Sequence, residues 1–476
     1  MSGETNAESN IMSQNVLKCR DDHQPVILTA QVGVAGEGSL QFVLTENSSC
    51  SWAKPKEAFG PDRLRPRIEP WLTALCQSEH LSLLLGSGLS PAIHFLGTGK
   101  PLPGMGLGDF GEENDLINSE TKKSANASGR GDGNIEDQIR VANELLRGLE
   151  ILGSSNKEAK ERAAELRKKL VAVLKSFADS ILLGERGVSA SEEVMRKSAF
   201  NYLVSFMMSF ASRSGTRDRL HIFTTNYDRF IEAGAEVAGM HLLDRFVGSL
   251  APIFRSSRLD LDMHYNPPGI RGEPRYLEGV ARYTKLHGSL DWMDCMRNIR
   301  RVAIPFGVDS IEPYLYAQGT KDADALRMMI YPNAAKDREA TSYPYVELFR
   351  DFAAAACRPN HTLIAFGYSF GDEHINRVIE DMLTIPSTHL VIISYGDPLS
   401  RIMRTYERLG RYAQISLLIG SHVGEFQSLV DNYLPKPAID RTTFRMAELL
   451  KMRWGTKQSE SQDNTAAPKN EDGGEV

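Results

Sequence analysis

Residues 362–395 read TLIAFGYSFGDEHINRVIEDMLTIPSTHLVIISY, and this stretch decides the fold. Two apolar segments, TLIAFGYS and HLVIISY, flank a segment whose apolar residues recur at the three- and four-residue spacing of a helix. A strand, a helix and a second strand in this order form a unit in which the two strands lie parallel in one sheet. The stretch therefore predicts an α/β protein.

The same alternation continues on both sides of this unit. Residues 345–356 have the pattern of a helix, and a helix, a strand and a further helix follow between residues 398 and 434. Upstream, LSLLLGSGLS (81–90) and LHIFTTNYD (220–228) are short apolar runs that stop at glycines or polar residues. We therefore expect a Rossmann-like, doubly wound parallel sheet with helices on both faces.

The regions around this core differ from it in composition. Residues 25–60 contain short alternating segments, which predict a small β-rich N-terminal extension. We expect the core at 61–435, with a helical insertion at 135–215 that follows a flexible, low-complexity loop at 119–134. The other expected segments are a disordered tail at 1–24, a C-terminal helix at 436–454 and a disordered tail at 455–476.

Charge and cysteine content narrow the classes of function. A net charge of −6 and a pI near 6.1 give no basic footprint, so nucleic acid is not an expected partner. The five cysteines form no C-x-x-C pair, which argues against a zinc ribbon or a disulfide framework and fits a reducing cytosol. No apolar run approaches the roughly 18 residues that span a bilayer, and no signal peptide is recognisable. We expect a cytoplasmic protein without a membrane partner.

Glycines and polar side chains gather at the ends of the predicted strands. GSGLS (86–90) would let the backbone approach a diphosphate, which amide groups at the next helix N-terminus would hold. TTNYD (224–228), KLHGS (285–289) and GYSFGD (367–372) occupy comparable positions. Because ligands of open α/β sheets bind outside the carboxyl ends of the strands, we expect these segments to converge on one site.

Each motif also has a structural interpretation. Asn226 and Asp228 could be turn or N-cap residues, His287 could be a half-buried core histidine, and Asp372 is well placed to cap the following helix. GSGLS lacks both the third glycine of the dehydrogenase fingerprint and a Walker lysine, which argues against hydride-transfer enzymes and P-loop ATPases. The functional interpretation is preferred because the motifs occur together at successive strand ends.

GSGLS, TTNYD, KLHGS and GYSFGDEHIN together resemble the sirtuin superfamily, and the resemblance covers roughly residues 60–435. With IYPNAAKD (330–337) and YTKLHGSLDW (283–292), the set more narrowly resembles the sirtuin-like subunits of bacterial antiphage systems that work beside a HerA-type ATPase. This resemblance implies NAD as the substrate, a HerA-type ATPase as a partner and a homo-oligomer. It also implies a role in antiphage defence by NAD depletion.

The sequence departs from deacylase sirtuins in three places. Their four-cysteine zinc module lies between the H-G and G-x-S motifs, where this chain has only Cys295 and Cys357. Their glutamine before the asparagine is Thr225 here, and their arginine-bearing loop has no clear counterpart, although GLGDF (106–110) lies in that region. We therefore expect no zinc and favour NAD hydrolysis over protein deacylation.

The resemblance implies an NAD glycohydrolase in which Asn226 and His287 are catalytic. Asparagine can offer an amide donor and a carbonyl acceptor, and histidine can exchange a proton near neutral pH. An NAD-dependent deacylase or ADP-ribosyltransferase, and a non-catalytic NAD-sensing subunit, stay open as alternatives. A nucleic-acid-processing subunit would need a carboxylate cluster, which we do not find. The expected NAD-binding residues are Gly86, Ser87, Gly88, Ser90, Thr225, Asp228, Gly367 and Ser369.

Overall fold

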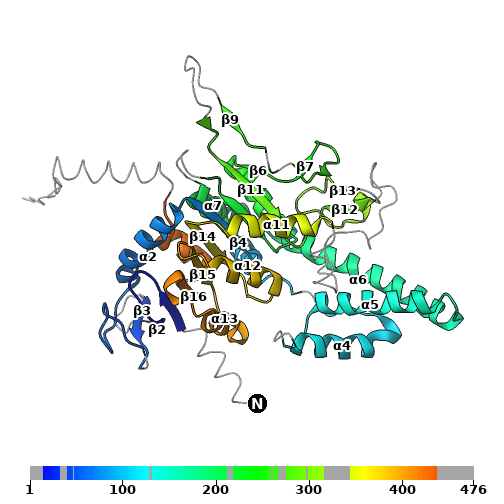
Figure 1. The fold of residues 1–476 in the computed structure, drawn as a ribbon, viewed down its shortest axis with the longest axis horizontal. Helices are drawn as coiled ribbons and strands as arrows, with labels where there is room; N and C mark the ends of the chain where they lie inside the picture. The colour runs from blue at the N-terminus through cyan, green and yellow to red at the C-terminus, as the bar shows by residue number, and fades with distance from the viewer. Residues whose placement is uncertain are drawn as a thin grey trace, which may run out of the picture. The chain divides into compact units, whose positions relative to one another are not determined.

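The computed structural model describes residues 14–32, 40–46, 48–104, 106–127, 131–211, 218–257, 259, 261–265, 275–295, 298–315 and 343–436. They are organised around a ten-stranded sheet with the order β3-β2-β1-β16-β15-β14-β4-β5-β11-β6 (Figure 1). Its parallel strands are β4 (His80–Leu85), β5 (His221–Thr224), β6 (His241–Leu243), β11 (Val280–Lys285), β14 (His361–Phe366), β15 (His389–Ser394) and β16 (Ile415–Gly420).

The chain winds this sheet in two directions from β4. It first adds β5, β6 and β11 on one side, and then returns to add β14, β15 and β16 on the other. The direction changes between β4 and β14, which lie side by side in parallel register. This is the doubly wound, Rossmann-like arrangement that the sequence predicts, and β4 and β14 form its switch point.

The N-terminal extension continues the sheet. β1 (Gln14–Lys18), β2 (Val26–Val32) and β3 (Leu40–Leu44) pair antiparallel, and β1 pairs antiparallel with β16. The expectation that residues 14–18 belong to a disordered tail is therefore wrong. Leu17 is fully buried in this strand, and pairing with β1 satisfies backbone groups that β16 would otherwise leave exposed at a sheet edge.

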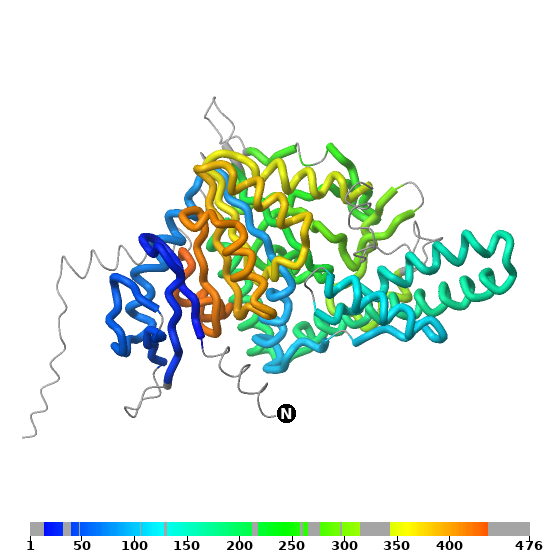
Figure 2. Tube along the Cα trace, turned by 60° about the horizontal axis from the view of Figure 1, so that its bottom comes forward, coloured from blue at the N-terminus to red at the C-terminus, as the bar shows by residue number. Residues whose placement is uncertain are grey.

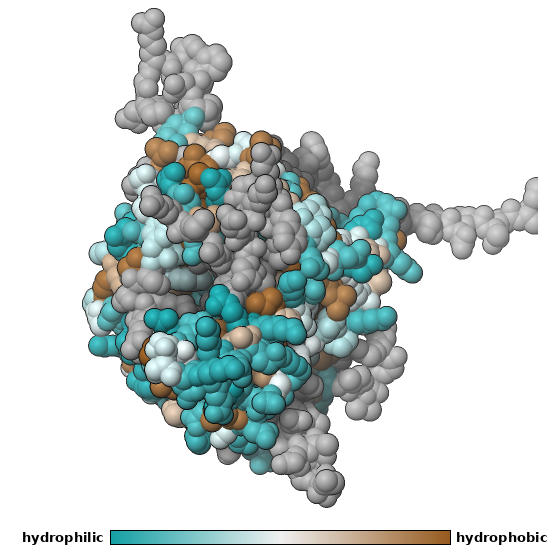
Figure 3. Space-filling model, turned by 90° about the vertical axis from the view of Figure 1, so that its right-hand side faces the viewer, coloured by the Kyte–Doolittle hydropathy of each residue, from teal (hydrophilic) through white to brown (hydrophobic). Residues whose placement is uncertain are grey.

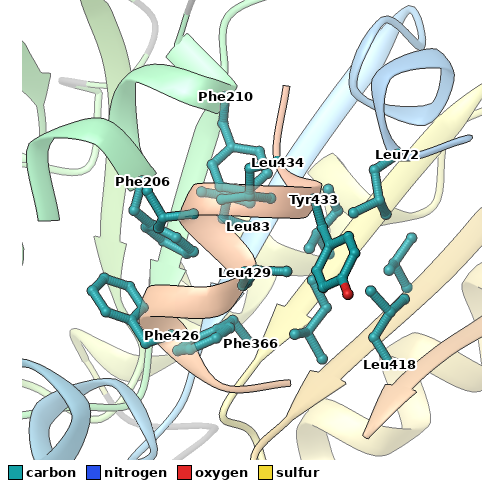
Figure 4. Close-up of a cluster of buried hydrophobic side chains, with 14 of the residues drawn as sticks. Leu72, Leu83, Phe206, Phe210, Phe366, Leu418, Phe426, Leu429, Tyr433 and Leu434 are labelled. Carbon is teal, nitrogen blue, oxygen red and sulfur yellow. The ribbon is translucent and has the colours of Figure 1, made fainter. Parts of the chain in front are cut away.

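Helices cover both faces of the sheet, because strand side chains alternate between the faces. Leu83 and Leu85 of β4 belong to one core and Leu84 to the other. In the first core, Phe206 lies 5.3 Å from Phe366 and 5.2 Å from Phe426 between ring centroids (Figure 4).

The helices divide between these two cores. The first core includes residues of α2 (Pro61–Cys76), α3 (Leu89–Thr98), α7 (Glu193–Ala211), α8 (Phe230–Ala238), α14 (Phe426–Ser428) and a π-helical turn (Leu429–Tyr433). The second core includes residues of α11 (Tyr345–Ala356), α12 (Glu373–Leu383) and α13 (Arg401–Leu409).

A third core is built mainly from α4 (Asn114–Ala127), α5 (Ile135–Leu152) and α6 (Lys157–Ser189), together with residues such as Tyr227, Leu290 and Met293. These helices and the strands β2 and β3 lie toward opposite ends of the sheet (Figures 1 and 2). The loop expected at 119–134 is helical as far as residue 127, since Ile117, Thr121 and Ala125 recur at four-residue spacing and are buried. α7, expected within the insertion, packs on the sheet instead. Hydrophilic side chains dominate much of the described surface on this side (Figure 3).

The remaining elements are short. They are η1 (Gly111–Glu113), β7 (Phe246–Val247), β8 (Ile253–Phe254), β9 (His264–Tyr265), β10 (Arg275–Tyr276), β12 (Trp292–Cys295), β13 (Asn298–Arg301), α9 (Glu312–Leu315), η4 (Pro398–Ser400) and η5 (Tyr412–Gln414). IYPNAAKD (330–337) and residues 437–476, which include nearly all of the expected C-terminal helix and the expected tail, lie outside the described residues. Across the described ranges, no helix is long and apolar enough to cross a membrane.

A half-buried histidine near the N-terminal strands gives the fold a pH dependence. Burial lowers the pKa of His389 from 6.5 to about 4, with a contribution from the charge of Lys18. The unfolded chain takes up a proton near pH 6.5, whereas the folded chain does so only near pH 4. The free energy of unfolding is therefore expected to fall as pH drops through this window, by up to about 3 kcal/mol from this residue.

Urea denaturation of His389→Gln at a series of pH values tests this prediction. We expect the loss of stability between about pH 6.5 and 4 to be smaller in the variant than in the wild type. His241→Gln is the matched control, because His241 is exposed and should leave the wild-type dependence in place. Equal pH dependence in His389→Gln and the wild type would contradict the prediction.

Candidate functional site

A cavity of about 460 Å³ opens at the carboxyl ends of the parallel strands, next to the β4–β14 switch point. This is where ligands of open α/β sheets bind. Segments that follow β4, β5, β11 and β14 all contribute to its wall, so the predicted convergence of the four motifs is observed. The predicted residues that line it are Ser87, Ser90, Thr225, Asn226, Asp228, His287 and Ser369.

The three predicted glycines have a packing role. A Cβ on Gly86 would lie 2.5 Å from the Gly367 carbonyl oxygen, and one on Gly88 would lie 2.8 Å from the Gly367 Cα. The Gly88 amide donates to the same carbonyl at 2.9 Å, and Gly367 has a φ of +62°. The glycines therefore close the β4 and β14 loops against each other, and they are absent from the cavity wall made by the described residues.

Asn226 is fixed by its side-chain amide nitrogen. Nδ2 donates to the Gly86 carbonyl at 3.0 Å and to the Ser90 Oγ at 3.1 Å, and Asn226 is only 7% exposed. Because a carbonyl oxygen can only accept, this contact sets the orientation of the amide. Both N–H groups are thereby used, contrary to the expectation that Asn226 offers a donor and an acceptor. Its Oδ1 has no hydrogen-bond donor among the described residues and can accept from a ligand.

Asp228 extends this chain of hydrogen bonds. The Ser90 hydroxyl donates to Asp228 Oδ2 at 2.5 Å, while Asp228 Oδ1 accepts from the Phe230 amide at the start of α8. Asp228 thus accepts a hydrogen bond at the start of α8 with one oxygen and binds Ser90 in the cavity wall with the other. Lys285, which sequence reasoning did not single out, is 2% exposed and donates to the Asp228 carbonyl at 2.5 Å and to Glu232 at 3.1 Å. A buried lysine therefore anchors the TTNYD loop through its backbone.

His287 and Asp372 form a second polar pair. His287 Nε2 lies 2.8 Å from Asp372 Oδ2, and Asp372 Oδ1 accepts from the His374 amide as the N-cap of α12. Because a carboxylate only accepts, neutral His287 carries its proton on Nε2, which leaves the Nδ1 lone pair as an acceptor. Tyr368 donates to the Asp372 carbonyl at 3.1 Å, and burial raises the pKa of this phenol well above its usual value.

Arg401, at the start of α13, lines the same cavity and was missed by sequence reasoning. Its Nε is buried and has no hydrogen-bond partner within the described part of the chain. A guanidinium suits a phosphate group, since its fork of N–H donors matches phosphate oxygens. The sequence offered no signal for it, because PLSRIM has the pattern of an ordinary helix start.

The helical insertion also contributes to the site. Ile135 of α5 and Ile181 of α6 line the cavity, which the sequence did not predict. Beside them, the Arg229 Nη2 of the TTNYD-R segment pairs with Glu185 Oε2 of α6 at 2.5 Å, and Glu185 is fully buried. Burial raises the pKa of Glu185, and the hydrogen bonds from Arg229 oppose this shift. This ion pair links α6 directly to the loop that carries Asn226.

Cysteines play no visible part in this cavity. Cys295 and Cys357, which occupy the interval of the deacylase zinc module, are free thiols. Within the described ranges, no group of three or more histidine, cysteine, aspartate or glutamate side chains is arranged to hold a metal ion.

Comparison with known proteins finds a family model that matches part of the chain. Residues 220–415 match the SIR2-like domain, and this segment holds three of the four motifs but not GSGLS. No curated protein matches the chain. The structure nevertheless brings Ser87 and Ser90 of the unmatched segment to the same cavity. SIR2-like domains use NAD. The match thus supports a sirtuin-like family for this chain, and with it an NAD-related function.

Proposed function

We propose that this chain is a cytoplasmic NAD glycohydrolase, which cleaves the nicotinamide–ribose bond of NAD to give nicotinamide and ADP-ribose. One observation carries the proposal. Asn226 and His287 line one cavity at the switch point, and the hydrogen bonds of each side chain leave one acceptor atom, Oδ1 and Nδ1. Two acceptors can orient and deprotonate an attacking water.

The chemistry of the reaction suits this pair. The bond breaks through an oxocarbenium-like transition state, as in glycoside hydrolysis. Nicotinamide leaves as a neutral molecule, so no strong acid is required on the leaving group. Water then adds its oxygen to the ribose carbon and gives one proton to His287 Nδ1. Asp372, hydrogen-bonded to Nε2, stabilises the imidazolium that results.

The cavity offers groups for the rest of the substrate. Ser87 and Ser369 supply hydroxyl donors on the two sides of the switch point, and Arg401 supplies a cation for the diphosphate. Asp228, held by Ser90, is placed to orient the nicotinamide amide or the Asn226 loop. The volume of about 460 Å³ lies within the range of small-molecule sites.

Replacing Arg401 by glutamine tests the diphosphate contact. We expect the KM for NAD to rise about tenfold with little change in kcat, because a phosphate contact far from the scissile bond acts equally in the ground and transition states. Arg404→Gln, one turn along α13 and exposed, is the charge-matched control. Steady-state kinetics of nicotinamide release give both constants. A fall in kcat at constant KM would show that Arg401 does not act through binding.

We further propose that the activity is restrained until a partner or an oligomer releases it, in antiphage defence by NAD depletion. This part rests on the resemblance to sirtuin-like subunits that work beside a HerA-type ATPase, and on the toxicity of unrestrained NAD hydrolysis. Homo-oligomerisation would belong to the same control. The Glu185–Arg229 ion pair could transmit such control, since a partner that shifts α6 would also move the loop that carries Asn226.

The decisive experiment measures nicotinamide release from NAD by the purified chain, with and without a HerA-type ATPase as the proposed partner. Release in either condition supports the proposal. Absence of release in both would refute NAD hydrolysis and favour a non-catalytic NAD-sensing subunit. Release that requires an acylated peptide or a protein acceptor would instead indicate a deacylase or an ADP-ribosyltransferase.

A further inference from the structure

A second cavity, of about 390 Å³, lies at the amino ends of the strands whose carboxyl ends form the first site. It is therefore separate from the NAD site and lies at the other end of the sheet. Its wall is mostly polar, although it adjoins the apolar core under α11. The polar side chains in the wall come from the first residues of the strands, among them His80 of β4, His221 of β5, Arg282 of β11 and His361 of β14. Other wall residues belong to α11 or lie next to the strand ends.

Strand register brings the polar side chains into one row. His221 is paired with Ser82 on one side and with Arg282 on the other, and His361 is paired with His80. Each of these strands buries apolar side chains under α11 further along, as Phe223 does two residues after His221. The face that α11 covers is thus apolar toward the carboxyl ends and polar at the amino ends.

The end of α11 leaves space over this row. α11 lies against β4, β11 and β14 (Figure 1), and its last turns contribute Ala354 and Ala355 to the cavity wall. Methyl side chains are too short to reach the polar row and fill the gap. The cavity therefore follows from small residues on the helix opposite large polar residues on the sheet.

Two deeply buried histidines are held by hydroxyl groups. His221 Nε2 lies 2.9 Å from Thr284 Oγ1, and His361 Nε2 lies 3.0 Å from Ser82 Oγ. His221 is 7% exposed and His361 is 1% exposed. The row is consequently fixed in position before any ligand arrives, as small-molecule sites usually are.

The carboxylates at this cavity are already paired with cations. Arg245 binds Asp351 with two hydrogen bonds, at 2.5 and 2.8 Å, and Arg358 Nη1 donates to Asp218 at 3.0 Å. Arg219, a third cation of the wall, pairs with Asp262 at 3.0 Å. These pairs balance the acidic charge of the wall.

Arg282 takes part in none of these ion pairs. Its Nε is buried without a hydrogen-bond partner, and no ion pair to its guanidinium exists among the described residues. Arg282 is half-buried, and a partly desolvated cation without a partner is unfavourable, whereas an anion bound beside it reduces that cost. The neighbouring Arg358, which is paired with Asp218, shares the wall and offers further N–H donors to the same cavity.

We propose that this second cavity binds a small phosphate-bearing anion, with Arg282 as its main contact. Phosphate is favoured because its oxygens accept from guanidinium and imidazole donors in several directions, and the cavity offers both kinds of donor. The volume has room for a small organic group attached to the phosphate as well. The proposal does not depend on NAD hydrolysis at the first site.

Isothermal titration calorimetry with inorganic phosphate, and separately with ribose 5-phosphate, tests this site. The full chain carries Arg401→Gln throughout, so that the first cavity contributes little binding. Adding Arg282→Gln is expected to weaken phosphate binding at least tenfold. Adding Arg255→Gln, which removes an exposed arginine outside the cavity, is expected to leave binding unchanged. Tighter binding of ribose 5-phosphate than of phosphate would support a phosphorylated metabolite, and equal binding would support phosphate itself.

Thermal unfolding supplies a second, independent measurement. Without phosphate, Arg282→Gln should raise Tm, because it removes a half-buried charge whose Nε has no hydrogen-bond partner among the described residues. With saturating phosphate, the parent should gain stability and the Arg282→Gln chain should not. Absence of saturable binding by both anions, or binding that Arg282→Gln leaves intact, would overturn the proposal.

Discussion

Replacing Asn226 by alanine is expected to lower the rate of nicotinamide release by about 10²–10³-fold, the usual effect of removing one positioned polar group from an active site. The variant should still bind ADP-ribose, because the expected phosphate contacts come from other residues. The loss should therefore appear in kcat. Asn226 Oδ1 is the acceptor that would hold the water or a ribose hydroxyl as positive charge develops on the ribose.

A substitution by aspartate separates the acceptor from the rest of the side chain. Asn226→Asp keeps an acceptor oxygen but places a second oxygen against the Gly86 carbonyl, where Nδ2 now donates at 3.0 Å. Two facing acceptors repel, so the loop should shift and activity should again be lost. If Asn226→Asp retained activity, the acceptor alone would suffice and the anchoring hydrogen bonds would be dispensable.

The matched control for these variants is Asn432→Ala. Asn432 also donates through Nδ2 to a backbone carbonyl, that of Ser428, but it lies in the π-helical turn and is not part of the cavity. It should keep wild-type kinetics. Full activity of Asn226→Ala, with the control equally active, would assign Asn226 to the structural role that its position before α8 also permits.

Most of the parallel sheet could be predicted, because its strands are local apolar runs with recognisable ends. β14 and β15 follow from TLIAFGYS and HLVIISY alone. β1 could not be predicted from its own residues, since QNVLK is short and partly polar. It is a strand because β16, some 400 residues away, leaves an edge for it to pair with. Contacts so distant in the sequence leave no local pattern.

In the candidate site, too, some residues could be predicted from local sequence and others could not. The polar residues that end each strand could be predicted to converge, because parallel strands present their carboxyl ends at one edge of the sheet. Arg401 and Glu185 could not, because each comes from a helix whose position depends on tertiary packing. The three glycines were predicted to bind NAD, and the structure shows that they form a backbone contact between two loops.

Replacing Asp372 by asparagine is expected to lower kcat by about 10²–10⁴-fold without unfolding the chain. Asparagine is as good an N-cap as aspartate, so α12 should keep its first turn. The new amide nitrogen would instead face His287 Nε2, now 2.8 Å from the carboxylate. Nε2 would have to accept, and the proton of the neutral ring would move to Nδ1, where it would remove the proposed base.

Three measurements distinguish this role of Asp372 from a structural one. His287→Ala should reduce kcat to a similar degree, and the double variant should be no slower than either single variant, because both changes remove one base. Asp397→Asn is a stringent control for helix support, because Asp397 accepts from the Ile402 amide through Oδ1 and from the Met403 amide through Oδ2, so that asparagine must give up one of these contacts. Additive losses for Asp372 and His287, or an equal loss in the control, would show that the carboxylate supports the helix and does not set the histidine tautomer.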